Sequence, residues 1–574
     1  MKRWLRAHGI LACILLLSAG LNCFYLHWGL PAHWHPDEKT RMSLVMKMFE
    51  QGTMNPHHFV NPSFNLYLIM AAVLPYAGIV KAMGLAVDPS VMYLIGRLVS
   101  AVMGAATVWM VYRITMLVAD RASAYFSALF LALTMGFVNL THFATSDITA
   151  VFLCTLTIFL SVRIVQKKRL RDYCYAGAAA GLALSTKYTA AVLIAPLVAA
   201  FLIDEGASLG NGAVTKRRRM IFVLEVICAS AAIALLVGAP AIARHLSPDG
   251  LIEKKTALFL TALQAKGMAA AAGLVVLLVF VWLRKKAGEA VIALCTHAKL
   301  RYALLAMAAV FFIATPYALL DARTFTDGIF NDWLLSVGMY DFGTLQTVPS
   351  WGPYMRALYA IMGWPLFLLS AAGFLYGMRL AFYKERRAFC ILLVWLGFFY
   401  ALLGAHYDVA SRYIMPIVPA AAVCAGILAG RYRVIAVFVL LYSCGYTLTL
   451  ESMFANDSRA RAGLWIAAHI PPRAPIATYS REDAYLPAIP AGFSVREGKE
   501  EEGDVRPGEY CVLTSANFAR YFWDTGTDPA RSAFYRTIFT SPLQYHLVAR
   551  FGYDSIFHVE ADGVDQTIVI LRKG

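Results

Sequence analysis

Long apolar runs recur along the first 450 residues of the chain, and they constrain its fold more than any other feature. Each run reaches the roughly 18 residues or more that a helix needs to cross a bilayer. Only 15% of the residues are charged, against roughly 25% in soluble domains. The runs predict an all-α polytopic membrane bundle of about 13 transmembrane helices.

The basic residues predict the orientation of this bundle. The formal net charge is +16, and the excess of lysine and arginine lies in short clusters between the apolar runs. The clusters occupy residues 2–6, 166–171, 216–219, 284–286, 384–387 and 431–433. Positive loops stay on the cytoplasmic side of a membrane. We therefore expect a multi-pass protein of the inner (plasma) membrane with a cytoplasmic N-terminus, and no nucleic-acid partner.

The clusters divide the chain into predicted spans and outer loops. The spans are 9–30, 91–118, 122–142, 148–165, two short spans within 173–203, 220–243, 263–283, 300–320, 355–381, 388–405, 413–430 and 433–450. The loop after residue 30 and residues 141–147 are both predicted on the outer face, so only two of the three runs between residue 63 and residue 142 can cross the membrane. The run 63–86 contains Pro75 and Lys81 and is the least regular of the three. We expect 63–86 to be a helix that lies at the outer interface or dips into it.

Residues 451–574 are predicted to form a small extracytoplasmic α/β domain after a transmembrane domain of residues 1–450. An amphipathic helix pattern at 458–472 ends at two prolines. Strand-like runs follow at 475–480, 509–515, 545–551 and 567–572. The ten cysteines include no CxxC spacing, so neither a disulfide framework nor a cysteine zinc site is predicted.

Two adjacent acids follow the first span, in the stretch HWHPDEKTRMSL (33–44). Pro36 before Asp37 and Glu38, and Gly52 after an amphipathic run, are typical of a helix start and end. The acids compensate the helix dipole, or one of them is a general base or metal ligand at the membrane surface. Asp147, at the start of a later span, leaves the same two interpretations open.

Several other polar residues fall on the predicted outer face. Lys187 and Arg412 either anchor the protein at the interface or bind a phosphate group. Tyr340, Asp341 and His406 are candidate substrate contacts in outer loops, although interfacial anchoring explains the aromatic residues of loop 321–354 equally well. His33 and His35 are a weak metal pattern. No cofactor is predicted with certainty, and a divalent metal is left open.

The residues and motifs of this sequence resemble those of the membrane glycosyltransferases of the GT-C type. The resemblance is carried by Asp37-Glu38, by FEQGTMNPHHFVNPSFNLYLIM after them, by Asp147, and by GLALSTKYTAAVLIAPL and SRYIMPIVPAAAV. The resemblance covers about residues 1–450 and rests on the order, spacing and sidedness of the motifs. It is closest to the protein O-mannosyltransferases and the bacterial lipid A aminoarabinose transferases, with their phospholipid-carrier-dependent kin. At Asn61-Pro62-Ser63 many relatives have a double proline, and this departure bears on substrate geometry.

The resemblance implies a chemistry and a role for each residue. A sugar would move from a polyprenyl-phosphate carrier to an envelope glycan, lipid or protein on the outer face. Asp37 would be the catalytic base, with Glu38 completing the acidic pair and Asp147 as the acid of the second outer loop. Lys187 and Arg412 would lie near the lipid phosphate. A single displacement would invert the anomeric centre.

Two other classes of protein function remain open. A polytopic transporter predicts ionisable groups inside the spans and an internal duplication, which the sequence does not show. A non-catalytic envelope assembly or sensor protein would not need acids and cations collected on one face.

Overall fold

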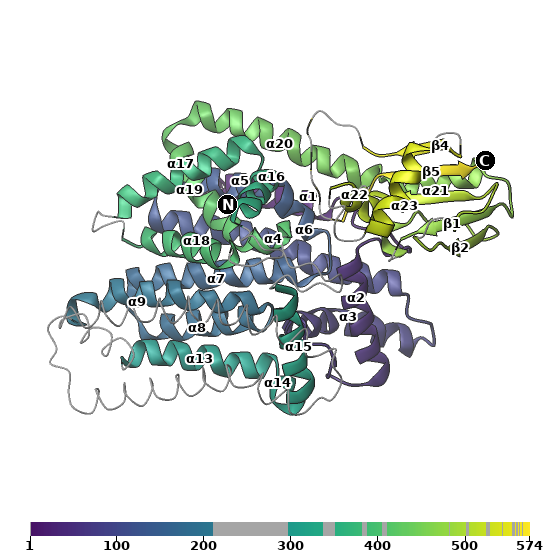
Figure 1. Ribbon diagram of the computed structural model, residues 1–574. Coiled ribbons are helices and arrows are strands. Elements are labelled where there is room, and N and C mark those ends of the chain that lie inside the picture. The colour runs from purple at the N-terminus through teal and green to yellow at the C-terminus, as the bar shows by residue number, and fades with distance from the viewer. Residues whose placement is uncertain are drawn as a thin grey trace.

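The structure is a computed structural model that describes residues 2–209, 297–336, 351–381, 387–404, 410–480 and most of 483–574. A bundle of helices is followed by a smaller part built on a five-stranded sheet, which lies at one end of the bundle (Figure 1). The predicted combination of a helical membrane bundle and a C-terminal α/β region is confirmed at this level.

All the regular secondary structure described up to residue 469 is helical. The first group comprises α1 (Lys2–Cys23), α2 (Pro36–Gln51), α3 (Phe64–Ala82), α4 (Pro89–Val118), α5 (Arg121–Ala132), α6 (Met135–Thr141), α7 (Ser146–Lys167), α8 (Leu170–Leu184), the 3₁₀ helix η1 (Tyr188–Leu193) and α9 (Ile194–Leu209). The second comprises α13 (Ala298–Ala314), α14 (Tyr317–Leu320), α15 (Ala322–Ser336), α16 (Trp351–Met362), α17 (Trp364–Ala381), α18 (Phe389–Gly404), η3 (Ser411–Ile417), α19 (Val418–Arg431), α20 (Arg433–Ala455) and α21 (Ser458–His469).

Six of the described helices are long and apolar enough to cross a membrane, and the bent pair of α5 and α6 makes a seventh if it is one span. The protein is therefore a multi-pass membrane protein. The predicted spans 220–243 and 263–283 lie outside the described residues, so the total of 13 stays a prediction. The helix α3 passes the same test of length and composition, which leaves its predicted interfacial position untested.

Helix α7 lies inside the bundle and contacts α4, α8 and α9. Of the residues in its most apolar stretch, 78% are buried. Helices α8 and α13 approach closely because Gly177 faces the backbone of Ala303, where a Cβ would overlap the carbonyl oxygen. Small residues allow such close helix packing in membranes.

Two of the predicted runs are interrupted. The expected break within 173–203 is confirmed, since α8 ends at Leu184 and η1 begins at Tyr188. The run 122–142 is not one straight helix, because α5 and α6 meet at a bend of 60°. At this bend the carbonyl of Leu133 accepts a hydrogen bond from Thr447 Oγ1 of α20, at 2.9 Å. A partner from another helix thus satisfies the backbone that the bend leaves open.

The C-terminal sheet has the strand order β2-β1-β3-β5-β4. Its strands are β1 (Pro475–Tyr479), β2 (Ser494–Glu497), β3 (Tyr510–Thr514), β4 (Tyr545–Phe551) and β5 (Ile568–Lys573), and its other helices are η4 (Asp483–Tyr485), α22 (Ser515–Trp523) and α23 (Pro529–Thr540). The pairs β1–β2 and β1–β3 are parallel, whereas β3–β5 and β4–β5 are antiparallel. The four predicted strands and the helix α21 are confirmed. The short, exposed edge strand β2 was not predicted.

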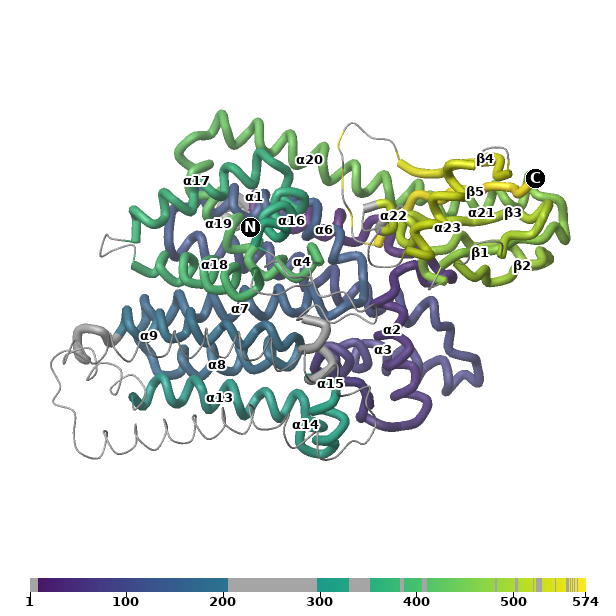
Figure 2. The backbone as a smooth tube through the Cα atoms, in the orientation of Figure 1, coloured from purple at the N-terminus to yellow at the C-terminus, as the bar shows by residue number. Residues whose placement is uncertain are grey.

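The chain brings its beginning and its end together. Figure 2 shows α2, near the start of the chain, beside the sheet formed by its last hundred residues, and residues of α2, β1 and β2 line a common cavity. The helix α20 runs to Ala455, five residues past the predicted boundary at 450, and α21 begins at Ser458. The division at that boundary stays a prediction.

Candidate active site

Helix α2 presents Asp37 in its first turn. His35 caps the helix, since its Nδ1 accepts a hydrogen bond from the backbone N–H of Glu38 at 3.3 Å. Pro36 is the first helical residue, and Gly52 ends the helix with a φ of 63°, which glycine adopts without steric cost. The Asp37 side chain is 45% exposed, and its Oδ2 lies 3.0 Å from Nη2 of Arg412.

Glu38 has a different environment from Asp37, although the two are adjacent. Its side chain is fully buried, and its two carboxylate oxygens accept hydrogen bonds from Nε and Nη2 of Arg97 at 2.8 and 2.7 Å. The backbone N–H of Ala144 donates a third, at 2.8 Å. Burial by itself raises the pKa of this carboxyl, but Arg97 and the Ala144 N–H together hold the pKa below its usual range. Glu38 is thus an ionised internal anchor for α2.

Asp147 and Lys187 form a second ion pair. Asp147 lies in the first turn of α7, and Lys187 precedes η1 at the turn between α8 and α9. The Lys187 ammonium donates to Oδ1 of Asp147, and the two side chains are 14% and 5% exposed. A pair this enclosed stays together only because each charge neutralises the other.

Tyr413 joins the two ion pairs. Nζ of Lys187 lies 5.1 Å and Cζ of Arg412 lies 5.3 Å from the centroid of the Tyr413 ring. Both distances are typical of cation–π contacts. The Asp37–Arg412 and Asp147–Lys187 pairs are therefore neighbours, although they come from four separate segments of the chain.

The structure adds Arg41, which was not predicted from the sequence. Arg41 lies one helical turn after Asp37 on α2, and its Nη1 donates to Oδ1 of Asn65 at 3.4 Å. Burial lowers the pKa of the Arg41 guanidinium, and the nearby carboxylates of Asp147 and Asp37 act in the opposite direction. The signal in the sequence was the spacing of four residues from Asp37, which puts both side chains on one helix face.

These five residues are called the charge cluster below: Asp37, Arg41, Asp147, Lys187 and Arg412. Three cations face two carboxylates, so the cluster carries one net positive charge when all five are ionised. An anion that enters the cluster therefore gains attraction, and arginine is well suited to a phosphate because its N–H groups match two oxygens at once.

Among the remaining candidates, His33 and His35 have partners outside the charge cluster. Tyr340, Asp341 and His406 lie outside the described residues. The ring of His33 stacks on Tyr93 with centroids 4.2 Å apart, and His35 caps α2. Within the described part of the chain no group of three or more histidine, cysteine or acidic residues is arranged to hold a metal ion.

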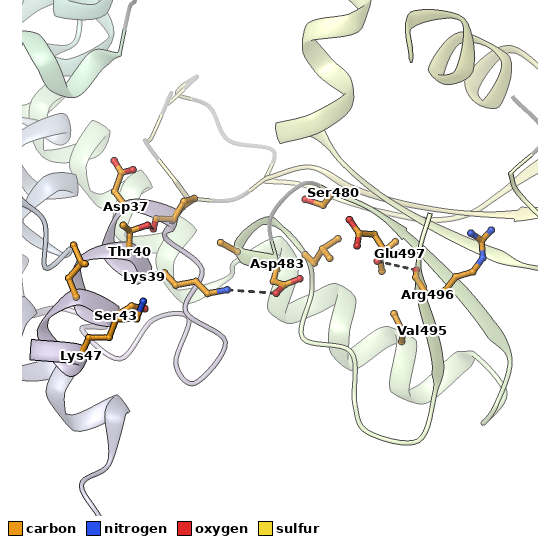
Figure 3. Close-up of a pocket in the computed structure, with 15 residues that line it drawn as sticks. Asp37, Lys39, Thr40, Ser43, Lys47, Ser480, Asp483, Val495, Arg496 and Glu497 are labelled. Atoms are coloured by element: carbon orange, nitrogen blue, oxygen red, sulfur yellow. Dashed lines mark hydrogen bonds and ion pairs between the residues drawn. The ribbon is translucent and has the colours of Figure 1, made fainter. Parts of the chain in front are cut away.

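A polar cleft adjoins the charge cluster. A cavity of about 840 Å³ lies between α2 and the sheet, with Asp37 among the residues that line it (Figure 3). Lys39 reaches across it from α2 to Asp483, at an Nζ–Oδ2 distance of 3.7 Å. The lining residues labelled in Figure 3 are Asp37, Lys39, Thr40, Ser43, Lys47, Ser480, Asp483, Val495, Arg496 and Glu497. Most of them are polar, as expected of a site for a hydrated ligand.

Part of the chain matches a known family. The family described as dolichyl-phosphate-mannose-protein mannosyltransferase matches residues 82–242. Asp147 and Lys187 lie inside this segment, whereas Asp37 and Arg412 lie outside it. The match confirms the resemblance to GT-C type glycosyltransferases that use lipid-linked donors. It also supports the prediction that this protein is a glycosyltransferase. No curated protein sequence matches the chain.

Solved structures show distant similarity over the whole chain. The oligosaccharyltransferase AglB of Archaeoglobus fulgidus, in complex with an inhibitory peptide and a dolichol-phosphate, is 14% identical, with 99% of this chain and 76% of that chain covered and a TM-score of 0.48. ArnT of Cupriavidus metallidurans in the apo state is 13% identical, with 98% of both chains covered and a TM-score of 0.45. At such low sequence identities and TM-scores, the similarity supports no conclusion about the donor or the acceptor.

Proposed function

We propose that this protein transfers a sugar from a polyprenyl-phosphate carrier to an acceptor hydroxyl at the outer face of the plasma membrane. Asp37 acts as the general base, and the reaction is a single displacement that inverts the anomeric carbon. The observation that carries the proposal is the charge cluster, in which the half-exposed carboxylate of Asp37 pairs with Arg412, near Arg41, at the rim of a polar cleft. The family that matches residues 82–242 is named for a dolichyl-phosphate sugar donor, which supports the same donor class.

The reaction needs one base and one site for the leaving phosphate. The acceptor oxygen forms a bond to the anomeric carbon as its proton passes to a carboxylate oxygen of Asp37. The bond from the anomeric carbon to the phosphate oxygen breaks, and the carrier phosphate leaves with the electron pair. A phosphate leaves as an anion, so this step calls for cations rather than for a proton donor.

Arg41, Arg412 and Lys187 supply those cations. Arg412 is paired with Asp37 in the structure. When the donor phosphate binds, it takes over hydrogen bonds of Arg412 and leaves the Asp37 carboxylate to accept the proton. Asp147 holds Lys187 in place through their ion pair. Glu38, whose oxygens are occupied by Arg97 and Ala144, positions α2 rather than reacting.

The cleft between α2 and the sheet is the proposed entrance for the polar part of the acceptor. It opens beside Asp37, and its lining comes from both ends of the chain. On this proposal residues 1–450 form the transmembrane catalytic domain and residues 451–574 lie outside the cytoplasm, which agrees with the basic clusters between the apolar runs. A transporter would place such ionisable groups along a path through the membrane, whereas this cluster adjoins a polar cleft.

Replacement of Arg412 by glutamine is expected to weaken binding of polyprenyl phosphate by about 10- to 100-fold, because one charge-assisted hydrogen bond to the phosphate is lost. Equilibrium binding of polyprenyl phosphate to purified protein in lipid nanodiscs measures this directly. The matched control is Arg461→Gln, which removes an exposed arginine of α21 and should leave the affinity unchanged. Equal affinities for Arg412→Gln and wild type would remove Arg412 from the phosphate site.

A tryptophan in place of Ser43 is expected to fill part of the cleft. We expect the KM for the acceptor to rise at least about tenfold, since a loss of fit of this size corresponds to a little over 1 kcal/mol, while the affinity for polyprenyl phosphate stays unchanged. Ser43→Ala, which leaves the space open, is the control. If Ser43→Trp kept the wild-type acceptor KM, the acceptor would have to enter elsewhere.

A further inference from the structure

The start of the C-terminal region contains a fully buried arginine. Arg459 lies in the first turn of α21, and its side chain is 0% exposed. Its guanidinium makes five hydrogen bonds, which is the full donor capacity of an arginine. They run from Nε and Nη2 to Asp457 at 3.0 and 2.8 Å, from Nη1 to the carbonyls of Trp34 and Ala484 at 3.1 and 2.9 Å, and from Nη2 to the carbonyl of Gly563 at 2.9 Å.

Two tryptophans of the segment between α1 and α2 enclose this guanidinium. Its Cζ lies 5.0 Å from the ring centroid of Trp28 and 4.9 Å from that of Trp34. Nε1 of Trp28 donates to Oδ2 of Asp457 at 3.1 Å. The Asp457–Arg459 pair and the loop residues Trp28 and Trp34 are therefore one buried unit, which we call the Arg459 clamp.

The clamp ends next to the proposed catalytic base. Trp34, whose carbonyl Arg459 binds, precedes His35, which caps α2 two residues before Asp37. Gly563, whose carbonyl Arg459 also binds, packs on the ring of His35, so closely that a Cβ at Gly563 would lie 2.8 Å from Cδ2 of that ring. The position at which α2 begins is thus fixed from two sides by contacts that include Arg459.

The same arginine also holds the opposite wall of the cleft. The carbonyl of Ala484 accepts a hydrogen bond from Arg459, and the neighbouring residue Asp483 pairs with Lys39 across the cleft. Both Ala484 and Asp483 line the cavity that Asp37 lines. A single side chain therefore sets the base and the cleft wall relative to each other.

We propose that Arg459 is a positioning residue that aligns the acceptor cleft with Asp37. On this account the C-terminal region completes the active site from outside the membrane, and an acceptor held in the cleft meets Asp37 only while the clamp is intact. The inference rests on the proposed function for its catalytic consequence. Its structural part, that Arg459 fixes residues 33–40, is independent of any activity.

Arg459→Lys tests the proposal, because lysine keeps the charge but lacks the planar arrangement of five donors. We expect kcat to fall about 10- to 100-fold, since a displacement of a reacting group by about 1 Å can lower the rate by up to about 100-fold. We also expect the acceptor KM to rise. The affinity for polyprenyl phosphate should stay at the wild-type value, because the cations that bind the phosphate are not in the clamp. Arg461→Lys on the same helix, at an exposed position, is the matched control.

A second readout needs no substrate. Hydrogen exchange of the backbone amides in residues 33–40 and 483–486 should be at least about fivefold faster in Arg459→Lys, whereas residues 145–150 at the start of α7 should be unchanged, because amide exchange reports local opening. If wild type transfers no sugar but this local change is seen, the proposed function fails and the clamp stands. If a folded Arg459→Lys protein shows wild-type kcat, acceptor KM and exchange, the clamp is wrong.

Gly563→Ala tests the clamp without touching Arg459, in case Arg459→Lys does not fold. The new methyl group meets the His35 ring at a glycine whose φ is 75°, so it should displace the start of α2. We expect a lower kcat with an unchanged affinity for polyprenyl phosphate. A folded Gly563→Ala protein with the kcat of wild type would overturn the proposal.

Discussion

Asp37→Asn is expected to lower kcat by about three orders of magnitude, within the range that a positioned general base contributes. Asparagine has nearly the same shape as aspartate but cannot accept a proton from the attacking hydroxyl. Arg41, Lys187 and Arg412 remain in place, so the affinity for polyprenyl phosphate should not decrease. Initial rates of carrier phosphate release at saturating donor, with purified protein in nanodiscs, measure the effect.

The control for this variant is Asp327→Asn, which removes an exposed carboxylate of α15. Its rate should stay within about twofold of wild type, since a change at an exposed position outside the charge cluster has little effect. A folded Asp37→Asn protein that keeps more than about a third of the wild-type rate would exclude a general base at this position.

Arg97→Met is expected to lower the free energy of unfolding by about 3–5 kcal/mol, because it leaves the fully buried Glu38 carboxylate without its partner. Arg97 also donates to the carbonyls of Leu26 and Trp28 at 2.6 and 2.7 Å, and both bonds are lost. Equilibrium unfolding in detergent measures the change. Arg113→Met, at an exposed position on the same helix, should stay within about 0.5 kcal/mol of wild type.

The acid dependence of this variant should be opposite to that of wild type. The pKa of Glu38 is lowered in the folded protein, so its ion pair stabilises wild type at neutral pH and this contribution disappears as the pH falls through that lowered pKa. Without Arg97 the isolated buried carboxylate binds a proton more readily in the folded state, so Arg97→Met should gain stability on acidification. A second substitution, Glu38→Gln, should recover part of the loss at neutral pH. Unchanged stability of Arg97→Met at neutral pH would contradict the anchoring role of Glu38.

The features that the sequence predicted are those set by local chemistry. Pro36 and Gly52 mark the ends of α2 because proline suits a first helical turn and glycine suits a left-handed end. The break before Tyr188 follows from a run too long for one crossing. The cluster of Asp37, Asp147, Lys187 and Arg412 was expected on one face because each residue stands beside a predicted membrane exit, and the structure brings these four together, while their roles stay predictions.

The features that could not be predicted from the sequence depend on packing between distant segments. Glu38 and Arg97 are 59 residues apart, and Arg459 and Trp34 are 425 residues apart. Contacts between residues so far apart in the sequence leave no periodic pattern that would predict them. Glu38 therefore resembled a second catalytic acid, and residues 451–574 resembled a separate domain. Burial decides between such alternatives, and it becomes visible only when α4, α2 and the start of α21 are placed against one another.

Release of free polyprenyl phosphate is the direct measure of the proposed sugar transfer. Purified wild-type protein in nanodiscs would be given radiolabelled polyprenyl-phosphate hexose and pentose donors with an envelope extract as acceptor, and free polyprenyl phosphate would be compared with labelled acceptor. We expect one donor to release its carrier one-for-one with acceptor labelling, with the anomeric configuration inverted. Folded protein that releases carrier from none of the donors, and that does not bind polyprenyl phosphate, would contradict it.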